Sequence, residues 1–294
     1  MKITKEKSLG IALLIQMLLY CAQSVVLTLC FSGAGQRVTL MLSCVTAIAV
    51  FGIPLLAYCK LTSVNVLDIC KDQSRNDRTR KPQKTVLLIF FGIAITVTAV
   101  NVFGMLTELI YGFFGKSTVT TPVSDPLTLV LVFARNVIIA SIMEELLFRG
   151  AVLDAFSEKK RTYAIMASAL LFALMHYSLG QFLYALAAGA VIATLAVITG
   201  SVGVAIIVHM AQNLVSFVFS VLALRMPENI YARVADIAFL LFFAIAVLGV
   251  IYFVRNSSEF QATAKPITAD NGKKPAVETL LYAVLALLLT VLNF

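Results

Sequence analysis

The chain has 294 residues, of which 60% are hydrophobic and only 13% are charged, and its mean hydropathy is +0.95. An ordinary soluble domain has about a quarter of its residues charged, so this composition excludes a soluble globular protein and predicts a multispanning membrane protein. The net charge of +8 comes from basic residues scattered over several loops without interleaved aromatic side chains, so we do not expect nucleic-acid binding.

Nine apolar segments follow one another along the chain. A helix needs about 20 apolar residues to cross about 30 Å of hydrocarbon. The segments near this length are 9–31, 38–59, 85–115, 127–148, 162–179, 181–199, 202–225, 237–254 and 278–294. The last has only 17 residues, so the sequence predicts an all-α transmembrane bundle of eight or nine spans, forming one domain over residues 1–294. The first segment is too long for a signal peptide and lacks a cleavage pattern, which predicts a retained helix.

The loops between the segments predict the orientation, because Lys and Arg accumulate on the cytoplasmic side of membrane proteins. If the N-terminus is cytoplasmic, seventeen of the 23 Lys and Arg residues lie in cytoplasmic loops, and the opposite loops hold only four. We therefore expect a multi-pass protein of the cell membrane with its N-terminus in the cytoplasm. The sequence does not predict an oligomeric state.

Few polar residues lie inside the segments, and a charge in hydrocarbon is costly unless it is paired or functional. They are Glu108, Arg135, Glu144, Glu145, Arg149, His176, His209, Gln212 and Asn213. Glu108 and Arg135 fall at similar depths, ~10 to 13 Å from the outer face at 1.5 Å per residue, which favours a neutralising pair between them.

Helix geometry separates the two neighbouring carboxylates of the stretch Glu-Glu-Leu-Leu-Phe-Arg. Glu145 and Arg149 are four residues apart and can form a salt bridge on one helix face. Glu144 is turned about 100° away and has no obvious partner in its own helix. A carboxylate without a cation in an apolar environment can exchange protons near neutral pH, so Glu144 is a candidate general base. The alternative is that both glutamates pair with arginines and only hold helices together.

Both histidines of the chain lie in apolar segments. Phe172 precedes His176 by one helical turn, and Asn213 follows His209 by one turn, so each pair shares a helix face. An imidazole and a carboxamide side by side can donate two hydrogen bonds to an oxygen that gains negative charge, as in an oxyanion hole. A buried histidine can also be a satisfied core residue, and this alternative stays open.

The depths of these residues present a problem. Counted from the cytoplasmic ends of their segments, His209 lies ~10 Å deep and His176 ~20 Å deep, with Glu144 in the inner half of the membrane. Straight, upright helices would keep them apart. We expect tilted helices, short helices or an interfacial segment at 150–165, together with a water-filled cavity.

Three motifs on successive apolar segments resemble those of the CPBP family, the CAAX prenyl protease and bacteriocin-processing intramembrane endopeptidases, also called Abi proteins. The motifs are Glu144-Glu145-x-x-x-Arg149, Phe172-x-x-x-His176 and His209-x-x-x-Asn213. The resemblance covers roughly residues 125–220, a catalytic core within the single domain, and the remaining residues match nothing beyond membrane helices.

The resemblance implies a role for each motif residue. Glu144 would activate a water molecule with help from His176, and His209 with Asn213 would stabilise the oxyanion of a scissile peptide bond. Glu145 and Arg149 would lock the local helix. We favour a mechanism without a metal, because HExxH is absent. Zinc is the alternative cofactor, with Glu144, His176 and His209 as its ligands.

The implied substrate is a membrane peptide or lipidated protein, such as a prenylated CAAX segment or a bacteriocin leader. Two other functions stay open. In a proton-coupled transporter the same residues would form a proton relay, although the related halves that transporters commonly have are not visible. In a catalytically silent immunity or scaffold protein with the same fold, Glu144 would not be needed.

Overall fold

The computed structural model describes residues 3–31, 33, 35–70, 82–114, 125–258 and 276–293. All regular elements within these ranges are helices, which confirms the predicted all-α fold class. In chain order they are α1 (Lys5–Phe31), α2 (Gln36–Thr62), α3 (Val66–Cys70), α4 (Pro82–Phe113), α5 (Pro126–Val132), η1 (Phe133–Ile139), α6 (Ala140–Glu145), η2 (Leu146–Val152), α7 (Leu153–Ala155), α8 (Arg161–Leu174), α9 (Leu179–Thr199), α10 (Val202–Arg225), α11 (Glu228–Arg255) and α13 (Val277–Leu292).

The described residues contain seven helices that are long and apolar enough to cross a membrane, so this is a multi-pass membrane protein. The elements α5 to α7 join end to end into one of the seven, Pro126–Ala155. The other two predicted segments are shorter than a span: α8 has 14 residues and α13 has 16. The segment predicted at 162–179 differs most from expectation, because its helix ends at Leu174 and a turn follows.

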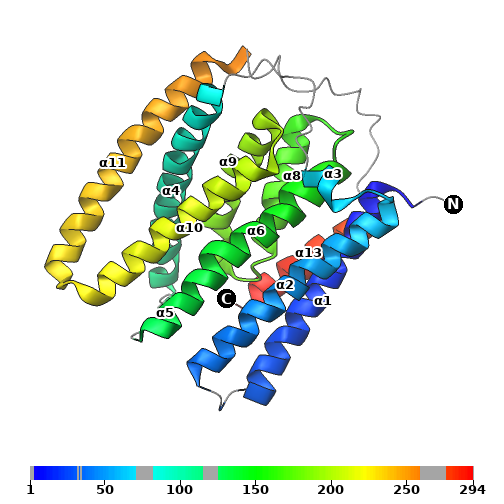
Figure 1. The fold of residues 1–294 in the computed structure, drawn as a ribbon, viewed down its shortest axis with the longest axis horizontal. Helices are drawn as coiled ribbons and strands as arrows, with labels where there is room; N and C mark the ends of the chain where they lie inside the picture. Colours follow the sequence, from blue (N-terminus) through cyan, green and yellow to red (C-terminus); the bar gives the residue numbers. More distant parts are fainter. Residues whose placement is uncertain are drawn as a thin grey trace.

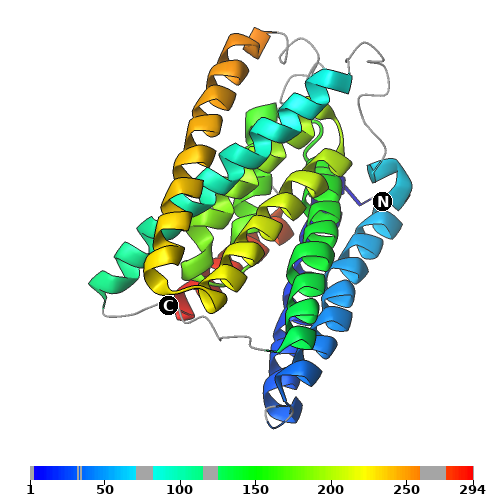
Figure 2. The ribbon, with the colours of Figure 1, turned by 60° about the vertical axis from the view of Figure 1, so that its left-hand side comes forward.

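The long helices are inclined to one another. α4 packs against α9 and α11, α8 packs against α9, and α1 packs against both α2 and α13. Figure 1 shows α11 at one edge of the bundle, α1 and α2 at the opposite edge, and α10 crossing α4 obliquely. In Figure 2 α4 in turn runs obliquely to α11. Inclination of this kind brings together residues that lie at different distances from their helix ends.

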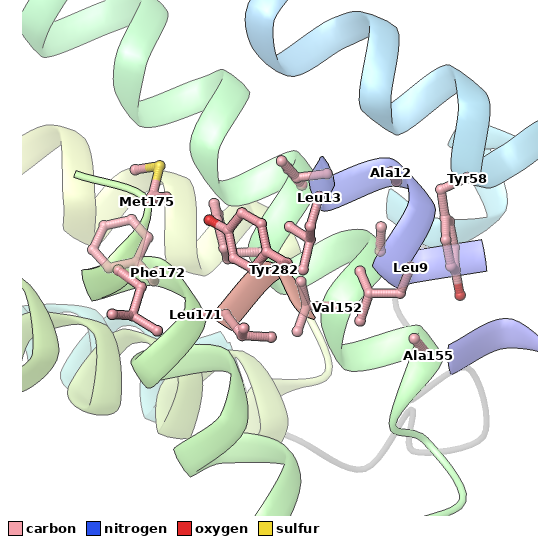
Figure 3. Packing of buried hydrophobic residues seen from close by; sticks show 14 of the residues in the cluster. Leu9, Ala12, Leu13, Tyr58, Val152, Ala155, Leu171, Phe172, Met175 and Tyr282 are labelled. Carbon is pink, nitrogen blue, oxygen red and sulfur yellow. The ribbon is translucent and has the colours of Figure 1, made fainter. Parts of the chain in front are cut away.

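A buried apolar cluster joins the two termini of the chain to its middle. Figure 3 shows Tyr282 of α13 between Leu13 of α1 and Leu171 of α8, with Phe172 and Met175 beside them. Because lipid tails are as apolar as leucine, close van der Waals packing and polar contacts hold such helices together in a membrane. The cluster includes the last helical turn of α8, which carries Phe172, so it also supports the predicted site.

Ion pairs gather where α1 and α13 begin and the helix Pro126–Ala155 ends. They are Lys5–Asp154 at 2.8 Å, Lys7–Glu278 at 3.3 Å and Lys159–Glu6 at 3.5 Å. These helix ends therefore lie on the same side of the bundle, as the orientation predicted from the basic loops requires. Parts of those loops, residues 71–81 and 259–275, lie outside the described residues.

The opposite end of the helix Pro126–Ala155 begins with a polar cap. Asp125 accepts hydrogen bonds from the backbone N–H of Thr128, at 3.1 Å, and from its hydroxyl group, and Arg37 lies 3.1 Å from the same carboxylate. These hydrogen bonds and the Arg37 guanidinium hold the pKa of Asp125 below its usual value. Pro126 occupies the first helical position, where its missing N–H costs nothing.

Candidate active site

The helix that carries both glutamates is π-helical on either side of them. η1 precedes α6 and η2 follows it, and the N–H of Ala140 donates to the carbonyl of Arg135, five residues back. Single π-helical turns are rare inside α-helices and occur frequently at functional sites. Each one shifts the angular position of the side chains beyond it. The faces occupied by Arg135, the glutamates and Arg149 therefore differ from those of a regular helix.

Glu145 is the centre of a buried ion-pair network. Its Oε2 lies 3.1 Å from Nε of Arg149, which is the predicted i to i+4 pair, and both side chains are fully buried. Its Oε1 accepts a hydrogen bond from Nδ1 of His209, at 2.8 Å. Glu145 thus does more than lock its own helix: it joins α6 to α10. The two residues are 64 positions apart, and the sequence did not predict this contact.

Arg149 continues the network towards α9 and α8. Its Nη2 donates to the carbonyl of Gly189, at 3.0 Å, and its guanidinium lies over the Phe172 ring, 4.5 Å from the ring centre. A cation over an aromatic face is stabilised most where water is excluded. Gly189 permits this approach, because a Cβ there would lie only 3.0 Å from Cδ1 of Phe172 and 3.3 Å from Cα of Ala169.

The hydrogen bonds of both histidines determine which ring nitrogen remains available to a ligand. Nδ1 of His209 donates to Glu145, and Nδ1 of His176 donates to the carbonyl of Phe172, at 3.0 Å. A carbonyl oxygen can only accept, so a neutral His176 carries its proton on Nδ1 and leaves Nε2 as an acceptor. The same holds for a neutral His209. Each imidazole therefore has one nitrogen held by the protein and one available to a ligand.

Phe172 brings the two histidines together. Its ring makes edge contacts with His176, at 5.1 Å between ring centres, and with His209, at 5.8 Å. His176 lies in the turn after α8, and His209 lies early in the inclined α10. The predicted difference in depth is thus overcome by helix inclination and by the Phe172 ring between the imidazoles. The short helix occurs as predicted, and the long helices are inclined to one another.

Asn213 projects towards η1 and α6. Its Nδ2 donates to the carbonyl of Asn136, at 2.9 Å, and to Oγ of Ser141, at 3.1 Å. Both amide hydrogens are therefore used within the protein. For Asn213 to donate to a substrate oxygen, one of these two hydrogen bonds must be exchanged.

Glu144 differs from every other residue of this group. It is half-buried and makes no hydrogen bond or ion pair with any residue that the structure describes. Its carboxylate is close enough to interact electrostatically with His209 and Arg149. Of two adjacent glutamates, one is completely engaged in the network and the other is available.

The predicted pair between Glu108 and Arg135 is wrong. Arg135 donates to Oδ1 of Asn136, at 2.7 Å, and its Nε is buried without a hydrogen bond among the described residues. The charge of Arg135 instead interacts with that of Glu144. The reason is that η1, which carries Arg135, packs against α2 and α10, whereas Glu108 lies on α4.

The arrangement does not fit the zinc alternative. Among the residues described, no three His, Cys, Asp or Glu side chains lie close enough together to hold a metal ion. Zinc sites of hydrolytic enzymes need three protein ligands about 2.0 to 2.2 Å from the ion. The Nδ1 bonds of both imidazoles are of the kind that zinc-ligating histidines make, but Glu144 does not complete a ligand set with them. We therefore derive no step through a metal.

The sequence analysis missed several groups that complete the site. Ser141 and the carbonyl oxygens of Asn136 and Gly189 hold predicted site residues. Ser141 precedes Glu145 by one helical turn, so helix periodicity was a signal for it. No local signal marks the two carbonyl groups, because their roles depend on contacts between helices.

The fold and the site define a class of protein: a multi-pass α-helical membrane protein with a buried Glu145–Arg149–His209 network. Both of its histidines contact Phe172. Residues 126–215 match the family model described as type II CAAX prenyl endopeptidase Rce1-like. The match covers about a third of the chain, and it confirms the resemblance to the CAAX protease family for the segment that holds all three motifs. No curated protein and no solved structure matches the chain.

Proposed function

We propose that this protein is an intramembrane endopeptidase of the CAAX protease type, in which Glu144 activates the water molecule that cleaves a peptide bond. The observation that carries the proposal is the contrast between two neighbouring carboxylates. Glu145 binds Arg149 and His209, whereas Glu144 makes no hydrogen bond or ion pair with the described residues. An available carboxylate close enough to interact with the oriented imidazole of His209 is a suitable general base.

The proposed reaction begins with a water molecule between Glu144 and His176. Nε2 of His176 accepts one hydrogen bond from the water and so orients it. Glu144 takes the other proton as the water oxygen forms a bond to the scissile carbonyl carbon. The carbonyl oxygen becomes an oxyanion, and Glu144 then delivers its proton to the departing amide nitrogen as the C–N bond breaks.

His209 and Asn213 are the proposed donors to the oxyanion. Because Nδ1 of His209 is held by Glu145, Nε2 donates only when the ring carries both protons, and the Glu145 carboxylate then lies against a positive imidazolium. Asn213 joins by exchanging its hydrogen bond to Ser141 for one to the substrate oxygen. An oxyanion donor of this kind contributes typically 10²- to 10³-fold to the rate.

The substrate class follows from the surroundings of the site. A peptide that reaches Glu144 must enter a bundle of apolar helices, so we propose a membrane-associated peptide, prenylated or carrying a leader. The accumulation of Lys and Arg in alternate loops of the sequence supports a cytoplasmic N-terminus and a site that is reached from the cytoplasm.

The test is a cleavage assay with purified wild-type protein and the Glu144→Ala variant. Each is incubated in detergent with a panel of membrane peptides that includes farnesylated CAAX peptides and leader peptides, and products are identified by mass spectrometry. We expect defined fragments from the wild type and from the control variant Glu228→Ala, which removes an exposed carboxylate of α11. Equal products from wild type and Glu144→Ala would exclude Glu144 from the chemistry.

A further inference from the structure

The turn that presents His176 contains a strained residue. Tyr177 has a φ of 48°, in the left-handed region that bulky side chains rarely adopt. Such a conformation persists only when surrounding contacts hold it in place. Tyr177 is 1% exposed and follows His176 directly, so whatever fixes its backbone also fixes the neighbouring imidazole.

Three contacts from the two ends of the chain hold Tyr177. Its hydroxyl donates to Oε1 of the buried Gln16 on α1, at 2.7 Å. Its ring packs against that of Tyr20, also on α1, with 4.7 Å between ring centres. Its carbonyl accepts a hydrogen bond from Nδ2 of Asn293, directly after α13, at 2.8 Å.

The helices that supply these contacts form a tightly packed pair. Gly10 of α1 lies so close to α13 that a Cβ there would be 2.5 Å from the backbone nitrogen of Thr279. Oγ1 of Thr279 donates to the carbonyl of Glu6, at 3.2 Å. Both helices lie outside the residues 126–215 that match the family model. The contacts to Tyr177 therefore come from helices outside the matched segment.

We propose that Gln16, Tyr177 and Asn293 are positioning residues that hold the His176 imidazole for its role in the reaction. The chain of causes is short. Asn293 and Gln16 fix both sides of the strained turn, and the turn keeps Nδ1 of His176 3.0 Å from the Phe172 carbonyl. If the turn relaxes, that hydrogen bond breaks and Nε2 turns away from the site. The catalytic part of this inference rests on the proposed function, whereas the structural part does not.

The experiment uses the fact that the chain has only two histidines. Protein labelled with ¹³C and ¹⁵N only at histidine gives two imidazole signals by NMR in detergent, assigned with His176→Gln and His209→Gln. The tested variants are Asn293→Ala and Tyr177→Phe. We expect the His176 signal to shift or broaden in both, while the His209 signal stays in place as an internal reference. In Asn293→Gln, which keeps the amide donor, the His176 signal should recover in part.

Two matched controls separate positioning from general loss of stability. Asn256→Ala removes an amide that likewise donates to a backbone carbonyl, that of Tyr252, at 2.7 Å. Tyr58→Phe removes a buried hydroxyl that donates to another helix, at 2.6 Å from Asp154. Both controls should leave the two histidine signals unchanged. An unmoved His176 signal in Asn293→Ala and Tyr177→Phe would overturn the proposal, as would equal shifts of both histidines.

The cleavage assay then tests the catalytic part with a farnesylated CAAX peptide. Asn293→Ala should lower kcat about tenfold with KM unchanged, because the imidazole is misplaced and the peptide site is intact. If the wild type cleaves no peptide, the proposed protease function fails, and the NMR result still decides whether the two helices position His176. An unchanged kcat despite a shifted His176 signal would overturn the catalytic role alone.

Discussion

Two carboxylate clusters on the same long helix make similar contacts but differ in whether a second carboxylate lies beside them. Near its end, Asp154 accepts from Nζ of Lys5 at 2.8 Å and from the Tyr58 hydroxyl at 2.6 Å. Nine residues earlier, Glu145 binds Arg149 and His209 in the same two-partner manner. Only the second cluster has a further carboxylate beside it, Glu144, that makes no such bond among the described residues. A carboxylate with two partners holds helices together, and the available neighbour is the group that we propose for the chemistry.

The largest expected effect compares the two adjacent glutamates. Glu144→Gln should lower kcat by about 10²- to 10⁴-fold, the usual contribution of a general base, while the thermal unfolding temperature stays near that of the wild type. Glu145→Gln should lower both, because it also loosens the network between α6 and α10. Peptide cleavage and thermal unfolding in detergent measure the two quantities. A Glu144→Gln variant that cleaves normally would show that the available carboxylate is not the base.

The next largest effect is a loss of unfolding free energy when Arg149 is replaced. Arg149→Met should lower the free energy of unfolding by about 3 to 5 kcal/mol, because removing one partner leaves Glu145 buried beside His209 alone. Equilibrium unfolding in mixed detergents measures the loss. The double variant Glu145→Gln, Arg149→Met should lose less than the sum of the two single changes, since it leaves no uncompensated charge. Strict additivity would mean that the two side chains do not stabilise each other.

A smaller effect on the free energy of unfolding is expected at the Asp154 cluster. Tyr58→Phe removes one donor to Asp154 and should cost about 1 to 3 kcal/mol of unfolding free energy, because a partly buried carboxylate loses a hydrogen bond. The kcat of the folded protein should not change. A kcat loss comparable to that of Glu144→Gln would mean that the two clusters are coupled, and the distinction drawn between them would fail.

The smallest expected effect is that of removing metals. Because the described donors do not assemble a three-ligand set, treatment with EDTA or 1,10-phenanthroline should leave the cleavage rate unchanged. The control is the same treatment of a known zinc protease in the same detergent. Loss of activity that added zinc restores would make His176 and His209 candidate ligands and would replace the proposed role of the water-activating carboxylate.

Local patterns were enough to predict the helical class, the motif-bearing core and the Glu145–Arg149 pair. The helical class and the pair depend on spacing along one helix, which the backbone geometry sets at about 1.5 Å and 100° per residue, whereas the core was predicted from the resemblance of three motifs to a known family. Patterns of this kind could not predict where α8 ends, since its apolar run continues to Leu179 while the helix stops at Leu174. They also failed for Arg135, whose partner depends on which helices lie beside η1.

The sequence by itself determined that this chain is embedded in a membrane and that a few polar residues follow one another along its apolar segments in the order of the family's motifs. Only the tertiary structure decided which glutamate binds His209, how Phe172 gathers both imidazoles, and that Gln16 and Asn293 hold the His176 turn. The physical reason is that the contacts between different helices join residues 37 to 161 positions apart. Close approach of inclined helices at small residues such as Gly189 makes them, and no periodicity within one segment records it.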